Sequence, residues 1–375
     1  MSEARINRIS NEKGDGGPSL SGITTFSGLN YFVPPKGTTA ERPSDCPPGS
    51  IRFNTDSAHL EYFDGLQWLE FEATNNELGI ANNAAGTSGG LGHRGVFGGG
   101  LNPAQINVIE YVTISTTGNS IDFGDLLNTN HQLSACSSST RGIFGGGNTT
   151  PTNSNVIQYI TISSTGDTQD FGDLTIARGG LGSCASSTRG LFLGSADPST
   201  NIIDYITIAS TGDAKDFGDT TITSRYGSSC ASSTRAVHCI GATPSTVNTI
   251  DFITISTTGN AADFGDLISG RTQTVSVSNS TRGILAVGGG NNLIDYVTIA
   301  STGNAQDFGD LTVIVQFPAG SCSSTRGVFG GGASPTLQNV IQYITILSTG
   351  NSIDFGDLLV PKYANAGLSN GHGGL

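Results

Sequence analysis

The tetrapeptide Asp-Phe-Gly-Asp occurs six times in this chain of 375 residues, beginning at residues 122, 170, 216, 263, 307 and 354. Two other markers repeat in the same register, and all three recur at intervals of 44 to 48 residues. One is usually Thr-Arg-Gly, and its arginines are Arg94, Arg141, Arg189, Arg235, Arg282 and Arg326. The other begins Asn-x-Ile at Asn107, Asn155, Asn201, Asn248, Asn292 and Asn339. A repeat of this length indicates a β-propeller or a solenoid.

Each repeat contains four strand signals. A run of small residues comes first, as at 183–187, and a segment that follows the arginine and ends in glycine comes second, as at 141–147. The third, as at 155–162, is rich in β-branched and aromatic residues, and the fourth surrounds the Asp-Phe-Gly-Asp motif. With 54 Gly and only 13% charged residues, the composition excludes a helical bundle and a disordered chain. Four antiparallel strands per repeat therefore predict the blades of a propeller.

The side chains of the strands support this prediction. Ile157 and Tyr159 point to one face of the third strand, whereas Val156 and Ile160 point to the other, so both faces are expected to be covered. Small residues in the first strand suit the crowded axis of a propeller. Three cysteines, Cys136, Cys184 and Cys230, share one position in that strand, and Cys322 is displaced by one residue.

The ring is predicted to close through the C-terminal strand. The chain has six copies of the fourth strand but seven candidates for the first, because residues 362–375 align with residues 178–191. We expect the C-terminal copy to be the innermost strand of the first blade. The prediction is an all-β, six-bladed propeller at 93–375, preceded by a small β N-terminal attachment segment at 1–75 and a linker at 76–92. Seven blades stay open if the N-terminal region contributes one.

The repeat unit resembles the kelch repeat over residues 83–375. The Gly doublet after the second strand, the Tyr of the third strand and the aromatic residue of the fourth strand carry this resemblance. The fourth-strand aromatics are Phe123, Phe171, Phe217, Phe264, Phe308 and Phe355, where kelch repeats have Trp. We expect each Phe to fill the space between two blades.

The first eighty residues contain a different pattern. Five prolines between residues 34 and 50 favour an extended connector. Residues 50–72 alternate in short strands around the turn Asp64-Gly65 and predict a small β-meander that holds the only Trp. A meander of this size needs a partner or a second copy to be stable.

The segment Pro-Gly-Ser-Ile-Arg-Phe-Asn-Thr-Asp at 48–56, followed by Leu-Glu-Tyr-Phe-Asp-Gly at 60–65, resembles a module of fibre and other structural proteins of tailed bacteriophages. Together with the Asp-Phe-Gly-Asp-Leu repeats, it makes the chain similar to virion structural proteins of marine cyanophages. The resemblance implies a location in the virion after assembly in the host cytoplasm. It also implies attachment through the N-terminal segment to other virion proteins, as a homo-oligomer.

Charge and hydropathy exclude several partners. The net charge is −13 and no basic block is present, so nucleic acid is not an expected partner. No apolar run reaches the length of a membrane span, and the first residues carry no apolar signal segment. The six Cys are expected to be thiols.

The sequence contains no convincing catalytic or metal-binding motif. The five His show no metal spacing, and no Glu follows Glu110, so a glycosidase acid–base pair is not expected. The repeated Asp pair suits Ca²⁺ by its chemistry, but six identical copies favour a turn in which one Asp accepts backbone N–H bonds. The arginine of each Thr-Arg-Gly marker either joins a ring that binds an anion or holds one blade to the next. We expect no cofactor and no enzymatic activity.

The links between strands differ in variability. The first-to-second and third-to-fourth links are nearly uniform, whereas the second-to-third and fourth-to-first links vary and emerge on the opposite face of a propeller. Variable loops on a rigid scaffold often carry recognition, although unselected drift explains them equally. The candidate recognition residues are His131, Arg178, Arg225, Tyr226, Arg271, Phe317 and Tyr363.

These observations predict a non-enzymatic bacteriophage structural protein, part of a fibre, neck or baseplate appendage, whose propeller binds a host surface polymer such as a glycan. The alternative is a decorating protein whose propeller contacts only other virion proteins. A glycan-cleaving enzyme is the third hypothesis, and it requires an asymmetric pocket with paired carboxylates.

Overall fold

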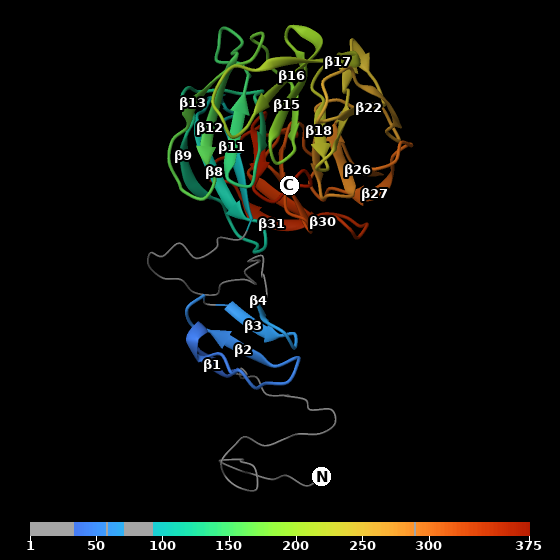
Figure 1. Cartoon of the computed structure of the whole chain (residues 1–375). Coiled ribbons are helices and arrows are strands. Elements are labelled where there is room, and N and C mark those ends of the chain that lie inside the picture. Colours follow the sequence, from blue (N-terminus) through green and yellow to red (C-terminus); the bar gives the residue numbers. More distant parts are fainter. Residues whose placement is uncertain (1–33, 58, 71–92, 289) are drawn as a thin grey trace, which may run out of the picture. The chain divides into compact units, whose positions relative to one another are not determined.

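The computed structural model describes residues 34–57, 59–70, 93–288 and 290–375. The chain divides into two compact units, Met1–Asn76 and Glu77–Leu375 (Figure 1). The linker predicted at 76–92 lies outside the described residues. The described residues contain strands, turns and one short 3₁₀ helix, so the predicted all-β class is confirmed.

Six four-stranded antiparallel sheets form the second unit, and we number them in chain order of their arginine markers. Sheet 1 contains β32 (Ala366–Ser369), β5 (Arg94–Gly98), β8 (Val108–Thr113) and β9 (Ile121–Asp125). Sheet 2 contains β10 (Ser134–Ser137), β11 (Arg141–Gly145), β12 (Val156–Thr161) and β13 (Gln169–Asp173). Sheet 3 contains β14 (Gly182–Ala185), β15 (Arg189–Ala196), β16 (Ser199–Thr207) and β17 (Lys215–Ser224).

The remaining three sheets repeat this plan. Sheet 4 contains β18 (Ser228–Ala231), β19 (Arg235–Cys239), β22 (Thr249–Thr254) and β23 (Ala262–Asp266). Sheet 5 contains β24 (Val275–Ser278), β25 (Arg282–Gly288), β26 (Asn291–Thr298) and β27 (Gln306–Asp310). Sheet 6 contains β28 (Ala319–Cys322), β29 (Arg326–Gly330), β30 (Val340–Thr345) and β31 (Ile353–Asp357). Two short hairpins, β6 (Leu101–Asn102) with β7 (Ala104–Gln105) and β20 (Ala242–Thr243) with β21 (Ser245–Thr246), lie in second-to-third links.

The C-terminal segment supplies β32, which pairs with β5 at the start of the repeats as predicted. The first strands of sheets 1 to 6 contact one another in order, and β28 of sheet 6 contacts β32 of sheet 1. In Figure 1 the red C-terminal strands accordingly lie beside the cyan strands that begin this unit. Each sheet is open at both edges, so the sheets are propeller-like blades and not a closed barrel.

The described residues form seven four-stranded sheets, whereas the repeats predicted six blades. The seventh sheet consists of β1 (Lys36–Gly37), β2 (Ile51–Asn54), β3 (His59–Phe63) and β4 (Trp68–Glu70), and it belongs to the first unit. The expectation of an extended connector at 34–50 was wrong in part, because β1 pairs in parallel with β2 and η1 (Thr39–Glu41) follows it. A three-stranded meander thus gains an edge strand.

The polar face of this N-terminal sheet is organised around one buried carboxylate. Glu61 is fully buried, and its Oε2 lies 2.6 Å from Nη2 of Arg42 and accepts a hydrogen bond from the Asn54 amide. Arg52 lies 3.3 Å from the same carboxylate and over the Trp68 ring. The strand register places Ile51, Phe53 and Leu60 on the opposite face, where Ile51 and Leu60 are exposed.

Apolar side chains from neighbouring sheets meet between the blades. One core cluster joins Ile143 and Phe171 of sheet 2 to Phe192 and Ile206 of sheet 3, and each of these side chains is at most 2% exposed. All six motif phenylalanines are 2% exposed. The expectation that both faces of a repeat sheet are covered is therefore confirmed.

Backbone contacts explain the Asp-Phe-Gly-Asp motif. The turn glycine of the next sheet donates its N–H to the motif Phe, as Gly212 does to the Phe171 carbonyl oxygen at 2.7 Å. Gly172 has φ +144°, and an added Cβ would lie 2.5 Å from the Gly212 backbone. The expected Asp acceptor was wrong: Asp173 donates its backbone N–H, and the acceptor is Oδ1 of Asp213.

Candidate functional site

The first strands of the repeat sheets surround a narrow space lined by small side chains. Each first strand contributes one residue to the middle of this lining. These residues are Ala135, Ser183, Ser229, Ser276, Gly320 and Gly367. At one end the space widens into a pocket of about 660 Å³, which includes volume open to solvent. We call this the mouth pocket, and all six repeat sheets contribute to its lining.

One residue per sheet stands at the rim of the mouth pocket, two positions before the first strand. These rim residues are Gln132, Gly180, Tyr226, Gln273, Phe317 and Ala364, and their φ angles lie between +53° and +69°. A positive φ is natural for glycine but costs free energy for other residues, most of all for bulky ones. The chain uses glycine at only one of the six rim positions. Because all six positions have a similar positive φ, this backbone turn is a feature of the fold. At the five positions without glycine, the side chain is present although the turn costs free energy there.

Backbone hydrogen bonds join the rim residues in a ring. In five of the six rim residues, the backbone N–H donates to the carbonyl oxygen of the preceding rim residue, as in Gly180 to Gln132 at 2.9 Å and Tyr226 to Gly180 at 3.1 Å. Three further bonds of 2.8 to 3.0 Å join Gln273 to Tyr226, Ala364 to Phe317 and Gln132 to Ala364. Five of the six possible links are thus formed.

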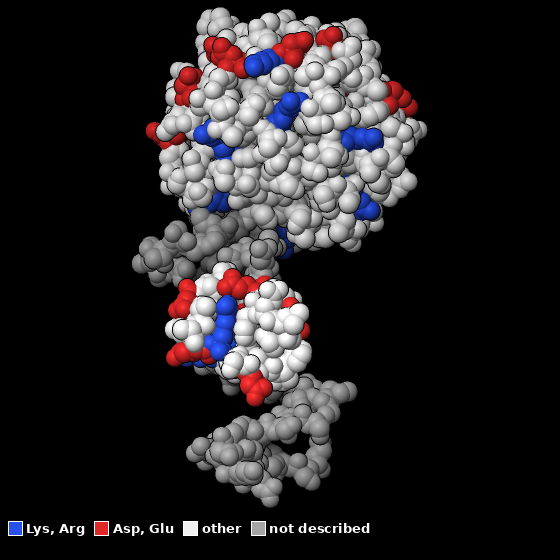
Figure 2. Space-filling model, in the orientation of Figure 1, with Lys and Arg blue, Asp and Glu red and all other residues white. Residues whose placement is uncertain are grey.

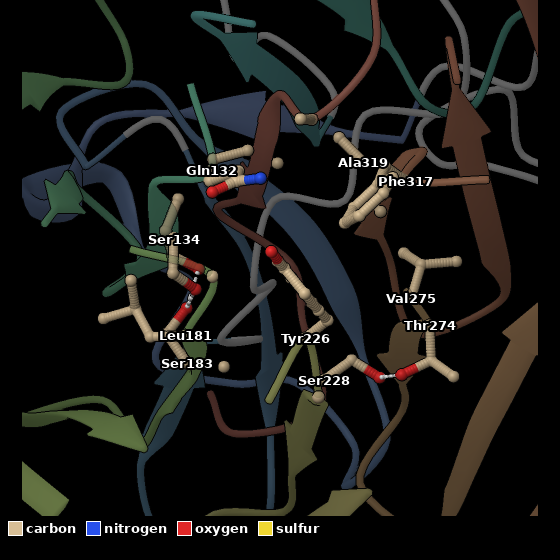
Figure 3. A pocket seen from close by; sticks show the side chains of 18 of the residues that line it. Gln132, Ser134, Leu181, Ser183, Tyr226, Ser228, Thr274, Val275, Phe317 and Ala319 are labelled. Atoms are coloured by element: carbon tan, nitrogen blue, oxygen red, sulfur yellow. Dashed lines mark hydrogen bonds between the residues drawn. The ribbon is translucent and has the colours of Figure 1, made fainter. Parts of the chain in front are cut away.

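Four of the six rim residues have side chains that are aromatic or carry amides. Tyr226 and Phe317 meet edge to face with ring centroids 5.3 Å apart, and Phe317 also lies 6.2 Å from the Tyr363 ring. In Figure 3 the Tyr226 hydroxyl points into the pocket between Gln132 and Phe317. None of the described residues that line the pocket is charged. Figure 2 shows a surface on which charged side chains are scattered among uncharged ones.

The other end of the central space is closed by the C-terminal tail. Nε2 of His372 lies 2.8 Å from the Ser137 carbonyl oxygen, and the Gly373 N–H donates to the Ser278 carbonyl oxygen at 3.0 Å. The tail passes so closely that a Cβ on Gly374 would overlap the Ala185 carbonyl oxygen. Burial lowers the pKa of His372, so the ring is neutral at pH 7. The mouth pocket is therefore open at one end only.

The seven predicted recognition residues fall into three groups. Tyr226 and Phe317 line the pocket, and Tyr363 packs beside Phe317. His131 and Arg225 precede rim residues and are partly buried: Nδ1 of His131 lies 3.2 Å from the Asn148 carbonyl oxygen, and the Arg225 backbone pairs with Gly241 and Ala242. Arg178 and Arg271 are wrong, because both are fully buried and cannot contact a ligand.

Arg178 and Arg271 instead form ion pairs inside the sheets. Nη2 of Arg178 lies 3.1 Å from Oδ2 of Asp204, and Nη2 of Arg271 lies 2.6 Å from Oδ2 of Asp295. Lys362 pairs in the same way with Glu110. Burial lowers the pKa of Lys362 and of Arg178, while the carboxylate partner opposes the shift. These three buried ion pairs lie in sheets 1, 3 and 5.

The recurring arginines hold neighbouring sheets together. In each, Nη1 donates to a carbonyl oxygen at the end of the next sheet's third strand, as from Arg141 to Ile208 at 2.9 Å. The other acceptors are the carbonyl oxygens of Ile162, Ile255, Ile299, Ile346 and Ile114. Each guanidinium also lies over the third-strand aromatic ring of its own sheet, at 4.3 to 4.7 Å. Of the two roles considered from sequence, the geometry matches contact between blades.

Sequence reasoning missed Gln132 and Gln273, which share their repeat position with Tyr226 and Phe317. A strict alignment of the six positions before the first strand would have found them. It could not have shown that the position has positive φ, because backbone contacts with neighbouring sheets impose that corner.

Two other reactive groups, the His238 imidazole and the Cys136 thiol, are buried. His238 is fully buried, its Nε2 lies 2.8 Å from Ser224 Oγ, and burial lowers its pKa to about 4. Burial raises the pKa of the Cys136 thiol to about 12. Among the described residues, no group of three or more His, Cys, Asp or Glu is placed to hold a metal ion. No helix in the described ranges is long and apolar enough to cross a membrane.

A comparison with models of known protein families finds no match to this chain, and no curated protein sequence matches it.

Proposed function

We propose that this chain is a non-enzymatic structural protein of a tailed bacteriophage virion, in which the six repeat sheets act as a six-bladed propeller that binds a neutral host surface glycan. The observation that carries the proposal is the mouth pocket. Its rim combines two aromatic rings, Tyr226 and Phe317, with the amides of Gln132 and Gln273, and no charged group lines it. Aromatic faces and amides are suited to the apolar faces and hydroxyl groups of sugars.

The N-terminal sheet is assigned the attachment role by this proposal. Its sequence resembles a module of phage structural proteins, and one face presents exposed Ile51 and Leu60 beside Phe53. A small sheet with an exposed apolar face gains stability when another chain covers it. Other virion proteins, or further copies of this chain, are the proposed occupants.

The test is binding of the labelled full-length protein to candidate host cells during competition with phage adsorption. Saturable binding that blocks adsorption supports the proposal. A variant with Tyr226→Ala and Phe317→Ala should lower cell binding at least tenfold. The matched control carries Ile121→Ala and Ile353→Ala, because both side chains are 58% exposed and begin fourth strands away from the mouth. Equal loss in both variants, or absence of binding by the native chain, contradicts the proposal.

A second candidate is a decorating protein whose propeller contacts only other virion proteins. It is favoured by exposed aliphatic side chains that come two to four residues after the Asp-Phe-Gly-Asp motifs and so recur around the ring. These are Leu127, Ile222, Ile268, Ile314 and Leu359, which are 38 to 53% exposed. Such a ring suits a protein partner better than a sugar. If the chain joins purified particles but binds no cells, this candidate replaces the first.

A further inference from the structure

The ring of rim hydrogen bonds is open at one place. By the pattern of the other five links, the Phe317 N–H would donate to the Gln273 carbonyl oxygen. In the part of the chain that the structure describes, neither group takes part in a hydrogen bond. The side-chain Oε1 of Gln273 is buried and also has no partner. One donor and two acceptors are therefore left unpaired at the junction of sheets 5 and 6.

The first strands at this junction differ from those elsewhere. Val275 and Val277 stand where sheet 4 has Ser228 and Cys230, and the opposite residue is Gly320. A Cβ on Gly320 would lie 2.6 Å from Cγ2 of Val275 and 2.9 Å from Cγ1 of Val277. The two branched side chains thus occupy the space between the strands, at the same junction where the rim link is absent.

Unpaired polar groups inside a protein are costly, so their presence beside a pocket suggests a ligand that pairs them. A hydroxyl group both accepts and donates. Placed in the open link, it accepts from the Phe317 N–H and donates to the Gln273 carbonyl oxygen. A carboxylate would accept from the N–H but would face the two oxygens of Gln273 without a proton to offer.

We propose that this open link is a subsite for one hydroxyl group of a neutral sugar, whose ring packs against Phe317 and Tyr226. The subsite rests on the proposed glycan binding and gives it a substrate class. Because the tail containing His372 and Gly373 closes the far end, a polymer cannot thread through the pocket. The ligand therefore enters by a chain end or a short branch, and the uncharged lining of the pocket favours a ligand without acidic groups.

The first experiment measures residue-specific amide hydrogen exchange in the full chain by NMR. Without ligand, the Phe317 amide should exchange at least tenfold faster than the amides of Gln132, Tyr226 and Gln273, which donate within the ring. A Phe317 amide as slow as these three overturns the inference even if the protein binds host cells.

The second experiment adds galactose, glucose or mannose, with glucuronate as the acidic control. At least one neutral sugar should slow Phe317 exchange tenfold or more, and glucuronate should not. If cells are bound but no neutral sugar protects Phe317, the subsite fails while the proposed function stands. If a sugar protects Phe317 but no cells are bound, the proposed function fails while the subsite stands.

Two variants separate the link from the aromatic contact. The double variant Val275→Ser with Val277→Cys copies the residues of sheet 4. It should let the Phe317 N–H bond to the Gln273 carbonyl oxygen. The sugar dissociation constant should then rise at least tenfold although the Phe317 and Tyr226 rings are still present. The control with Ile121→Ala and Ile353→Ala, which lie outside the pocket lining, should change the sugar dissociation constant less than threefold. An unchanged dissociation constant in the valine variant, together with a slowed Phe317 amide, overturns the subsite.

Discussion

The two faces of the repeat unit differ in how regularly their contacts recur from sheet to sheet. On the face of the uniform links, each arginine donates to the next sheet and each turn glycine to the preceding motif Phe, six times with nearly the same distances. At the mouth, the six equivalent corners carry glycine and four other residue types, Gln, Tyr, Phe and Ala, and one hydrogen-bond link is open. Contacts that recur in every sheet stabilise the ring, whereas the face that varies is the one available for recognition.

The strongest test of this comparison places a branched side chain in the uniform region. Gly172→Val should lower the free energy of unfolding by about 5 kcal/mol, because it combines a positive φ with overlap of the next sheet's backbone. Chemical denaturation measures the change. Gly166→Ala is the control, since its Cβ would meet nothing within 4 Å, and it should cost about 1 kcal/mol. Equal losses would show that close approach between sheets is unimportant.

Loss of a buried ion pair should lower the free energy of unfolding nearly as much. Arg178→Met leaves the fully buried Asp204 without its cation, and we expect a loss of about 4 kcal/mol. Adding Asp204→Leu should recover most of that stability, because the uncompensated charge is then gone. A double variant no more stable than the single one would contradict this account.

The buried histidine gives a pH test. The folded pKa of His238 is about 4, below its ordinary value of 6.5, so the unfolded chain binds more protons between these values. The contribution of His238 is therefore complete above about pH 6.5 and is lost as the pH falls toward 4, by up to about 3 kcal/mol. His238→Leu, which copies Leu285 of sheet 5, should flatten that part of the stability–pH curve. An unchanged slope would contradict the assignment.

Loss of a single recurring arginine should lower the free energy of unfolding by a smaller amount. Arg189→Met removes one bond to the Ile255 carbonyl oxygen and the contact with the Tyr205 ring, and we expect a loss of about 1 to 2 kcal/mol. Lys215→Met in the exposed part of the same sheet should change stability by less than about 0.5 kcal/mol. Similar losses in both variants would remove the special role of the marker arginine.

The smallest effect has the opposite sign. Gln132→Gly at the rim should raise the free energy of unfolding by up to about 1 kcal/mol, because glycine adopts φ +53° without strain. Thermal unfolding checks this result. A destabilised variant would show that the Gln132 side chain supports the fold, and the contrast between the two faces would weaken.

Much of the fold could be predicted from the sequence because its signals are local. Alternation in segments such as 155–162 and the glycine turns predicted the strands, and the extra first-strand copy predicted the pairing of β32 with β5. The N-terminal sheet was only half predicted, because the two-residue β1 has no periodicity of its own. The site was predicted in part: Tyr226 and Phe317 line the pocket, whereas Arg178 and Arg271 do not.

The sequence by itself determined the repeat unit and the order of its strands, since a period of 44 to 48 residues and a turn glycine are properties of neighbouring residues. Tertiary structure alone decided which loop residues face the central space, which basic side chains are buried, and where the hydrogen-bonded rim is open. Those features depend on contacts between residues about one repeat apart or more, such as Ala364 with Gln132, and therefore on how six sheets share one axis. A positive φ at Phe317 or a buried charge at Arg178 has no local signal, because the constraint that imposes it comes from the neighbouring sheets.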